Sequence, residues 1–300
     1  MKSIEHVLVL GAGTMGTQIG LQCAAFGCSV MIYDAVDAAL ESAKPRLGRL
    51  AKIMVKQGRI SADQARDGLA RITLTNDVET AAKDADLISE SVPEDPALKM
   101  KVLGRFNTLC REDTIFTTNS STLLPSQVAR GTGRPDRFLA LHFHDCTTTN
   151  VVDVMPHGET DPAVVAQVLA FCRAIDQYPI ELKKENHGYV FNTMLSALLG
   201  SALDLAAGDV ARVADIDRSW MGIMGTRVGP FGIMDAVGLE TVYKITAYWA
   251  ARDKNPAKQA RAAFLKSYVN KGELGIKTGR GFYTYPQPEF LSPEFMAGIH

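Results

Sequence analysis

Short apolar runs alternate with longer segments of helical periodicity through the first half of the chain. The apolar runs predict β-strands at His6–Leu10, Ser29–Tyr33, Arg71–Leu74, Leu87–Glu90, Thr114–Thr117, Phe138–Leu141 and Val151–Met155. Between them, segments such as Thr14–Phe26 and Asp95–Leu109 carry apolar residues at helical spacing. Because strands that alternate with helices pair in parallel, the pattern predicts an α/β fold with a doubly wound, mostly parallel sheet.

Two longer helical patterns differ from this alternation. Residues Asp37 to Ile60 predict a long basic helix that protrudes from the sheet, with a kink at Pro45 and a turn at Gly58. Residues Tyr189 to Ala206 are apolar nearly all round, which is typical of a helix buried in a bundle or a dimer interface. We therefore predict a sheet domain over residues 1–186 and an all-helical second domain over residues 187–300.

Length, composition and charge narrow the class of protein. A single hydrophobic core rarely grows beyond roughly 250–300 residues, so a chain of 300 residues is expected to form two domains. No apolar run approaches the roughly 20 residues that span a bilayer. The net charge is −1 and the basic residues are spread along the chain, so we expect neither a membrane span nor a nucleic-acid partner.

The cysteines and the N-terminus indicate a reducing compartment. The cysteines are odd in number and scattered, without CxxC spacing: Cys23, Cys28, Cys110, Cys146 and Cys172. This pattern argues against a disulfide framework and against a zinc cluster, so we expect free thiols and no metal. The N-terminus shows no secretory signal pattern, and we expect the protein in the cytoplasm.

A glycine-rich motif follows the first predicted strand and opens a helix: Gly11, Ala12, Gly13, Thr14, Met15 and Gly16. In a GxGxxG motif of this setting, Gly11 permits the tight turn and Gly13 lets the backbone approach a pyrophosphate. Gly16 allows the helix to pack closely on the sheet, and the helix N-terminus then holds the pyrophosphate. The motif predicts a Rossmann dinucleotide-binding domain.

Asp34 strengthens that prediction, because it ends the second strand about 20 residues after the motif. A carboxylate there accepts hydrogen bonds from ribose hydroxyls and repels a 2′-phosphate, so the sequence favours NAD over NADP. FAD is a lesser alternative, and a simple glycine turn with Asp34 as a helix N-cap is another.

Further motifs resemble the 3-hydroxyacyl-CoA dehydrogenase family, in chain order and over almost the whole chain: Thr118–Leu123, Leu141–Phe143, Val151–Val154, Gly188–Asn192, Gly229–Phe231, Asp235–Leu239 and Gly275–Tyr283. The resemblance implies NAD-dependent interconversion of a 3-hydroxyacyl-CoA and its 3-oxoacyl-CoA, as in fatty acid β-oxidation. It favours a short acyl chain, as in 3-hydroxybutyryl-CoA dehydrogenases. It also implies a helical domain that forms a homodimer and an active site between the domains.

Carried over by position, the resemblance implies a set of site residues. The catalytic base is His142, supported by Asp153, while Ser121 and Asn192 lie near the substrate oxygen. The cofactor side includes Glu94, Lys99 and Asn119. A histidine with an ordinary pKa near 6.5 can take a hydroxyl proton, and a carboxylate on its far nitrogen fixes its tautomer.

Each of these residues also has a purely structural interpretation. His142 alone is consistent with a core histidine, Asp153 with a polar residue on the outer face of a strand, and Ser121 with loop capping. Asn192 is consistent with a helix–helix hydrogen bond. Glu94 is equally consistent with a helix N-terminal acid, and Lys99 with a solvated face.

The chain departs from the family pattern beside the histidine. The family usually has His-Phe-Phe-Asn-Pro where this chain has residues 142–146, His-Phe-His-Asp-Cys. The family usually carries Glu where this chain has Asp153, with one residue more before it, and Pro where it has His187. We found no further ligands that would make a metal site of His144, Asp145 and Cys146, nor partners for a nucleophilic cysteine.

These departures from the family pattern lie near the expected acyl group, so several substrates are consistent with the sequence. The basic residues Lys44, Lys52, Lys56 and Arg59 suit the phosphates of coenzyme A or simply a solvated helix face. One alternative is a dehydrogenase of a free 3-hydroxy acid, such as a sugar acid or carnitine, or a reductase of a diketo ester. Another is an NAD-binding protein without catalytic activity.

Overall fold

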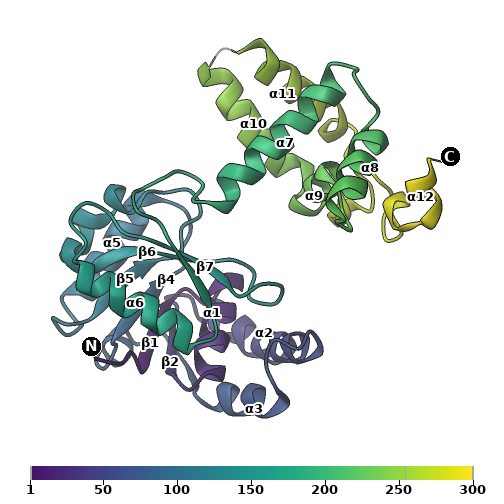
Figure 1. Cartoon of the computed structure of the whole chain (residues 1–300). Coiled ribbons are helices and arrows are strands. Elements are labelled where there is room, and N and C mark those ends of the chain that lie inside the picture. The colour runs from purple at the N-terminus through teal and green to yellow at the C-terminus, as the bar shows by residue number, and fades with distance from the viewer. Residues whose placement is uncertain (1, 254, 299–300) are drawn as a thin grey trace. The chain divides into compact units, whose positions relative to one another are not determined.

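The computed structural model describes residues 2–253 and 255–298, and the chain divides into two compact units. The first unit ends at Val190 and the second begins at Phe191 (Figure 1). The division at residue 186 stays a prediction for the limits of the independently folding domains. Within the described ranges, no helix combines the length and apolar character needed to cross a membrane.

The first unit is built on one eight-stranded sheet with the order β3-β2-β1-β4-β5-β6-β7-β8. The strands are β1 His6–Leu10, β2 Ser29–Tyr33, β3 Ile72–Thr75, β4 Leu87–Glu90, β5 Ile115–Thr118, β6 Phe138–Phe143, β7 Val151–Met155 and β8 Tyr178–Glu181. All neighbouring strands are parallel except β6 and β7, which a short loop connects. The strand order reverses between β1 and β4, where sheets of this kind bind their ligands.

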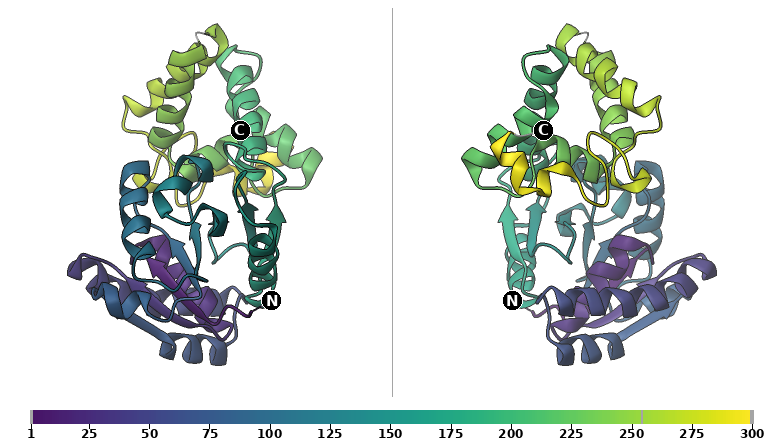
Figure 2. Two further views of the ribbon diagram at one scale, coloured as in Figure 1. Left: turned by 90° about the vertical axis from the view of Figure 1, so that its left-hand side faces the viewer. Right: turned by 90° about the vertical axis from the view of Figure 1, so that its right-hand side faces the viewer.

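Helices cover both faces of this sheet (Figures 1 and 2). They are α1 Thr14–Ala25, α2 Asp37–Lys56, α3 Ala62–Ala70, α4 Val78–Ala82, α5 Pro96–Asn107 and α6 Pro162–Ala174, with 3-10 turns at Pro125–Gln127, Ala129–Thr132 and Pro135–Arg137. Alternate residues of β1 serve opposite cores: Val7 and Val9 pack with α1, α2 and α6, whereas Leu8 and Leu10 pack with α4 and α5. The predicted doubly wound α/β fold is therefore confirmed.

Several predicted element boundaries differ from the structure. The predicted helix Asp37–Ile60 continues through Pro45 but ends at Lys56. The predicted turn at Gly58 is present, with a φ of 69°, and a new helix, α3, starts after a capping box at Ser61. The strand β8 was missed, since Pro179 lies inside a short run at the sheet edge.

The regular elements of the second unit are all helices within its described residues, apart from isolated bridges near Arg280, so the prediction of a helical domain is confirmed. Its elements are α7 Phe191–Ala207, α8 Val213–Met224, α9 Pro230–Val237, α10 Leu239–Asp253, α11 Pro256–Val269 and α12 Pro293–Ala297, with 3-10 turns at Ile276–Thr278 and Glu289–Leu291. The helix predicted from Tyr189 begins two residues later, because Tyr189 has a φ of 53°. Phe231 and Met234 of α9 are fully buried in the core of this unit.

Two buried carboxylates connect α8, α9 and the segment near Tyr283 in the second unit through hydrogen bonds. Asp217 of α8 accepts hydrogen bonds from the backbone N–H of Phe231 (2.9 Å) and of Gly232 (3.0 Å) at the start of α9. It also accepts the hydroxyl of Tyr283 at 2.9 Å. Asp235 of α9 accepts the backbone N–H groups of Phe282 and Tyr283, which fixes the glycine-rich segment near the end of the chain. Burial raises the pKa of Asp217 to about 6, despite the hydrogen bonds that favour its charged form.

Replacing Asp217 tests this anchor. We expect Asp217→Ala to lower the free energy of unfolding by about 2–4 kcal/mol, because buried N–H donors lose their acceptor. Since the folded-state pKa lies above the ordinary 3.8, Asp217 stabilises the fold most below about pH 4, and this contribution is lost as the pH rises through about 6. Denaturant unfolding of Asp217→Asn between about pH 5 and pH 8 should therefore show a shallower pH dependence than the parent. The exposed Asp209→Asn serves as the control, and an unchanged slope in Asp217→Asn would contradict the assignment.

Candidate active site

The glycine motif forms a tight turn between β1 and α1. Gly11 has a φ of 108° and its N–H donates to the carbonyl of Tyr33 at 2.8 Å. A Cβ on Gly11 would press on the Ser91 carbonyl, and one on Gly16 would collide with the Gly11 carbonyl oxygen. Both positions therefore require glycine for the close approach of backbone to backbone, as the motif predicts.

The start of α1 suits the pyrophosphate of a dinucleotide. The space where a Cβ of Gly13 would lie is open to 4 Å, so a ligand can approach the backbone there. The helix begins at Thr14, with Met15 next, and has neither a side-chain cap nor an acidic residue in its first turn. Its N–H groups and dipole are thus available to an anion, which is the fit that NAD requires.

Asp34 lies directly after β2 and beneath the glycine turn. Its carboxylate accepts the N–H of Ala12 at 2.8 Å and that of Val36 at 3.0 Å. Helix α2 has Val36 at its N-cap position, so the alternative of Asp34 as the helix cap is wrong. The carboxylate is half-buried and lies next to the loop where a ribose is expected, and its contact with the ribose stays a prediction.

A buried ion pair that sequence reasoning missed lies at the end of β4. The ammonium of Lys99 is 2.8 and 3.0 Å from the two carboxylate oxygens of Glu90 and 3.3 Å from Glu94. Lys99 is only 1% exposed, and burial raises the pKa of Glu90 in spite of Lys99. The signal in the sequence is Glu90 at the end of an otherwise apolar strand, where a charge needs a buried partner.

Glu94 fixes the loop that follows β5. Its carboxylate accepts the hydroxyls of Ser120 and Thr122 and the N–H of Thr122 at 3.2 Å. Burial acts against ionisation, but these hydrogen bonds and Lys99 hold the pKa of Glu94 below its usual value. Glu94 thus holds this loop in place, and Lys99 pairs with both Glu90 and Glu94. Direct contacts of Glu94 and Lys99 with the cofactor stay predictions.

Asn119 and Ser121 lie on either side of Ser120 in this loop. The N–H of Asn119 donates to the Glu90 carbonyl at 2.8 Å, and its side-chain oxygen accepts the N–H of Phe143 at 2.7 Å. The loop is therefore attached to the end of β6, next to His142. Ser121 is exposed, and its hydroxyl makes no hydrogen bond with another described residue, while its contact with a substrate oxygen stays a prediction.

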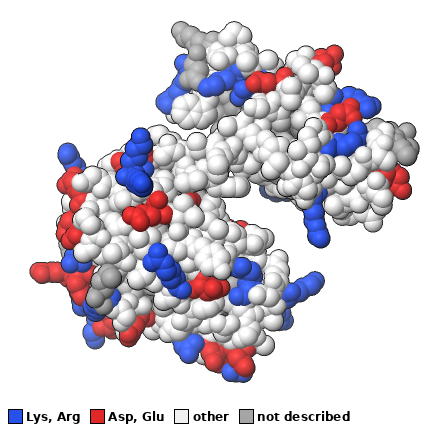
Figure 3. Space-filling model, in the orientation of Figure 1, with Lys and Arg blue, Asp and Glu red and all other residues white. Residues whose placement is uncertain are grey.

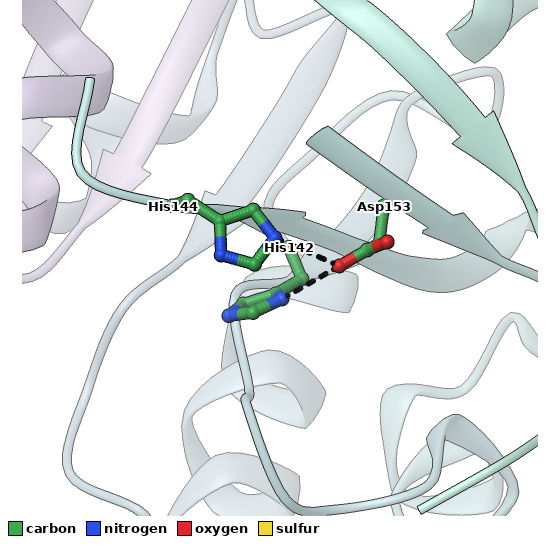
Figure 4. A group of neighbouring side chains, drawn as sticks. All are labelled: His142, His144 and Asp153. Carbon is green, nitrogen blue, oxygen red and sulfur yellow. Dashed lines mark hydrogen bonds and ion pairs between the residues drawn. The ribbon is translucent and has the colours of Figure 1, made fainter. Parts of the chain in front are cut away.

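His142 and Asp153 face one another across the antiparallel pair β6–β7. Nδ1 of His142 lies 3.2 Å from Oδ2 of Asp153 (Figure 4). His144, two residues further along the chain and on the same side, places its Nε2 3.0 Å from the same oxygen. The shorter acid and the shorter connection thus keep contact with His142, and the outer-face alternative for Asp153 is wrong, because Asp153 is 1% exposed.

The charge of Asp153 determines the state of His142. Burial opposes ionisation, but the hydrogen bonds from His142 and His144 lower the pKa of Asp153. An ionised carboxylate only accepts, so Nδ1 of His142 carries the proton and Nε2 is left with its lone pair. Nε2 has no hydrogen-bond partner among the described residues. This is the state that a general base needs.

Tyr189 adds a contact to His142 that was not predicted, and Asn192 is the last residue of the predicted set. The ring of Tyr189 packs on His142 with 4.8 Å between centroids, and its hydroxyl donates to the Ser120 carbonyl at 2.6 Å. Sequence reasoning missed Tyr189 in this role, since it expected a helical residue there. Asn192 lies in the first turn of α7, in the second unit, and its role beside the substrate stays a prediction.

Known proteins resemble this chain over nearly its whole length. The family models of the 3-hydroxyacyl-CoA dehydrogenase NAD binding domain and C-terminal domain match residues 6–186 and 188–285. The mitochondrial hydroxyacyl-coenzyme A dehydrogenase of Rattus norvegicus is 31% identical over 289 residues, which cover 94% of this chain and 91% of that protein.

Two solved structures show the same fold and also span the chain. A diketoreductase is 42% identical with a TM-score of 0.87, covering 95% of this chain and 100% of its own. A (S)-3-hydroxybutyryl-CoA dehydrogenase from Ralstonia eutropha is 28% identical with a TM-score of 0.84 and the same coverage. Because the family models match most of the chain, and its glycine turn suits the dinucleotide, this protein belongs to the NAD-dependent 3-hydroxyacyl-CoA dehydrogenase family.

Proposed function

We propose that this protein is an NAD-dependent dehydrogenase that interconverts a 3-hydroxyacyl-CoA and the corresponding 3-oxoacyl-CoA, a step of the kind used in fatty acid β-oxidation. The observation that carries the proposal is His142, held through Nδ1 by the buried carboxylate of Asp153 at 3.2 Å. The family match supplies the reaction class, since the family is named for this chemistry.

The residues of this chain handle the proton and the developing charge. NAD supplies the hydride acceptor when bound at the glycine turn, and NADH the donor in reduction. In oxidation, Nε2 of His142 takes the proton of the substrate hydroxyl, and Asp153 stabilises the imidazolium that forms. The hydroxyl of Ser121 and the amide of Asn192 are proposed to donate hydrogen bonds to the substrate oxygen as its charge changes. In reduction, His142 returns the proton.

A coenzyme A thioester is the substrate that the family relatives favour. The rat relative and the Ralstonia eutropha structure are named for acyl-coenzyme A substrates. Lys44, Lys52 and Lys56 of α2 are exposed and provide positive charge for phosphate groups. Figure 3 shows basic and acidic side chains interspersed over the visible face of the first unit, without a single basic stripe.

Reduction of a dicarbonyl compound without coenzyme A is the second candidate function. The diketoreductase is 42% identical to this chain, against 31% for the rat enzyme. His144, Asp145 and Cys146 also replace the usual family residues beside the catalytic histidine. His144 also contacts Asp153, the carboxylate that holds His142, so this departure lies directly beside the proposed proton relay.

Replacing His142 separates an enzyme from a protein that only binds NAD. We expect His142→Gln to lower kcat by roughly 10²–10⁴-fold, because the general base is lost while the glycine turn is untouched. NADH binding, followed by fluorescence titration, should stay within about twofold of the parent. The matched control is His6→Gln, whose exposed ring lies at the start of β1. Unchanged turnover in His142→Gln would contradict the mechanism.

A substrate comparison decides between the two candidate functions. We expect kcat/KM for acetoacetyl-CoA to exceed that for free acetoacetate and for a diketo ester by about 100-fold or more, since remote binding energy from coenzyme A raises the rate. NADH absorbance is the readout. A higher kcat/KM for the diketo ester would favour the second candidate, and equal values would remove the thioester from the proposal.

We also propose that the second unit forms a homodimer. On α10, Ile245, Tyr248 and Trp249 are 53%, 50% and 45% exposed and recur at helical spacing, so they form one apolar stripe on the free chain. Light scattering on a sizing column should give the mass of two chains. Ile245→Asp should shift the protein toward one chain, whereas Lys52→Asp on α2 should not. A monomeric parent protein at micromolar concentration would contradict the proposal.

A further inference from the structure

The side chains of His142, His144 and Asp153 form a compact group of potential metal ligands. One ligand atom from each residue lies within 4.8 Å of the others. The two imidazole nitrogens, Nδ1 of His142 and Nε2 of His144, point at the same carboxylate oxygen from 3.2 and 3.0 Å (Figure 4). The strands explain the arrangement: His142 and His144 share a face of β6 or its continuation, and Asp153 is opposite His142 on β7.

From this geometry we propose that His142, His144 and Asp153 bind one Zn²⁺ ion, and that the bound ion inhibits the dehydrogenase. The inhibitory part rests on the proposed role of His142 as the general base. The zinc-binding part rests only on the ligand atoms and their positions.

Two of the three ligand-atom separations match those around a tetrahedral ion, and the third, between the two histidine nitrogens, is within 4.8 Å. Zinc binds histidine nitrogen and carboxylate oxygen at about 2.0–2.2 Å, so neighbouring ligand atoms around it are roughly 3.3 Å apart. The observed separations of 3.2 and 3.0 Å from Oδ2 of Asp153 differ from this by a few tenths of an ångström. Two nitrogen donors with one carboxylate favour zinc over magnesium or calcium, which prefer oxygen ligands.

The surroundings allow the ion to enter. The side chain of His144 is 18% exposed, whereas those of His142 and Asp153 are 7% and 2% exposed, so solvent reaches the group at His144. A water molecule can take the fourth position, as in zinc sites with three protein ligands. The ordinary family residue at position 144 is Phe, which offers no ligand, so the site belongs to this chain's departure from the family pattern.

Zinc binding changes which ring nitrogen of His142 holds the proton. In the free protein Nδ1 carries the proton, and Nε2 holds the lone pair that accepts the substrate proton. A zinc ion on Nδ1 needs that lone pair at Nδ1, so the proton moves to Nε2. His144 changes in the same way, its proton leaving Nε2 for Nδ1. Both rings stay neutral, no proton is lost, and His142 can no longer accept one from the substrate.

Direct metal titration tests the binding. The full-length protein, freed of metal with a chelator, is titrated with Zn²⁺ in competition with a chromogenic chelator, and with Co²⁺ to record the visible absorption of a tetrahedral site. We expect one ion per chain. Loss of a group that only supports a ligand weakens metal binding about 10–100-fold, so His144→Phe, which removes a ligand, should weaken it by about 100-fold or more.

Control variants keep this test decisive. Asp153→Ala should weaken zinc binding as His144→Phe does, while His6→Gln should bind as the parent does. His144→Gln provides a second replacement, and thermal unfolding identifies any variant that has not folded. Equal zinc affinity in the parent and in both folded His144 variants would overturn the site, as would no binding below about 100 μM Zn²⁺, a level far weaker than structural zinc sites show.

Inhibition is measured separately, so that failure of the proposed function can be told from failure of the zinc site. Zn²⁺ should inhibit NADH oxidation by the parent at the concentration at which it binds, and His144→Phe should need about 100-fold more, relative to its own zinc-free rate. Zinc binding without inhibition would overturn the inhibitory role but not the zinc-binding site. A protein that binds zinc as expected but turns over no 3-oxo substrate would refute the proposed function alone.

Discussion

The structure of the site depends on one buried carboxylate that stays ionised. Asp153 is almost fully buried, which by itself favours the neutral acid, and two imidazoles overcome that preference by donating to it. If Asp153 were neutral, its O–H could donate to Nδ1 of His142, and the tautomer with the proton on Nδ1 would no longer be required. The proton relay, the family reaction and the candidate zinc site all follow from this single hydrogen-bonded group.

The sheet makes the arrangement possible. Parallel strands β4, β5 and β6 end at the same edge, so the Glu90–Lys99 pair, the Ser120–Thr122 loop and His142 come together there. The turn to an antiparallel β7 brings Asp153 back beside His142. Glu94 and Asn119 then hold the loop to its neighbours through hydrogen bonds. Rigid elements thus position each side chain before any ligand binds.

Much of the fold could be predicted from the sequence, because hydrophobic periodicity reports burial directly. The strands β1, β2, β4 and β7 have the predicted bounds, since each is a short apolar run between polar turns. β8 was missed because its edge position leaves it partly exposed and tolerates Pro179. The start of α7 was placed too early because an apolar pattern does not reveal the positive φ of Tyr189.

The site residues could be predicted from the sequence only where a local motif or a family resemblance identifies them. The glycine turn and Asp34 were found from spacing, and His142 with Asp153 from resemblance to a family. The contact between His144 and Asp153 depends on strand register, which a single sequence does not specify. The pairing of Lys99 with Glu90 is likewise a tertiary contact, although an acid at the end of an apolar strand hints at one.

The tautomer of His142 tests the central claim most directly. Nitrogen NMR on the 15N-histidine-labelled protein near pH 8, with the His142→Gln spectrum for assignment, distinguishes a ring protonated at Nδ1 from one protonated at Nε2. We expect a neutral His142 with its proton on Nδ1 in the parent, and loss of that preference in Asp153→Ala. A proton on Nε2 of His142 in the parent, or no change in Asp153→Ala, would contradict it.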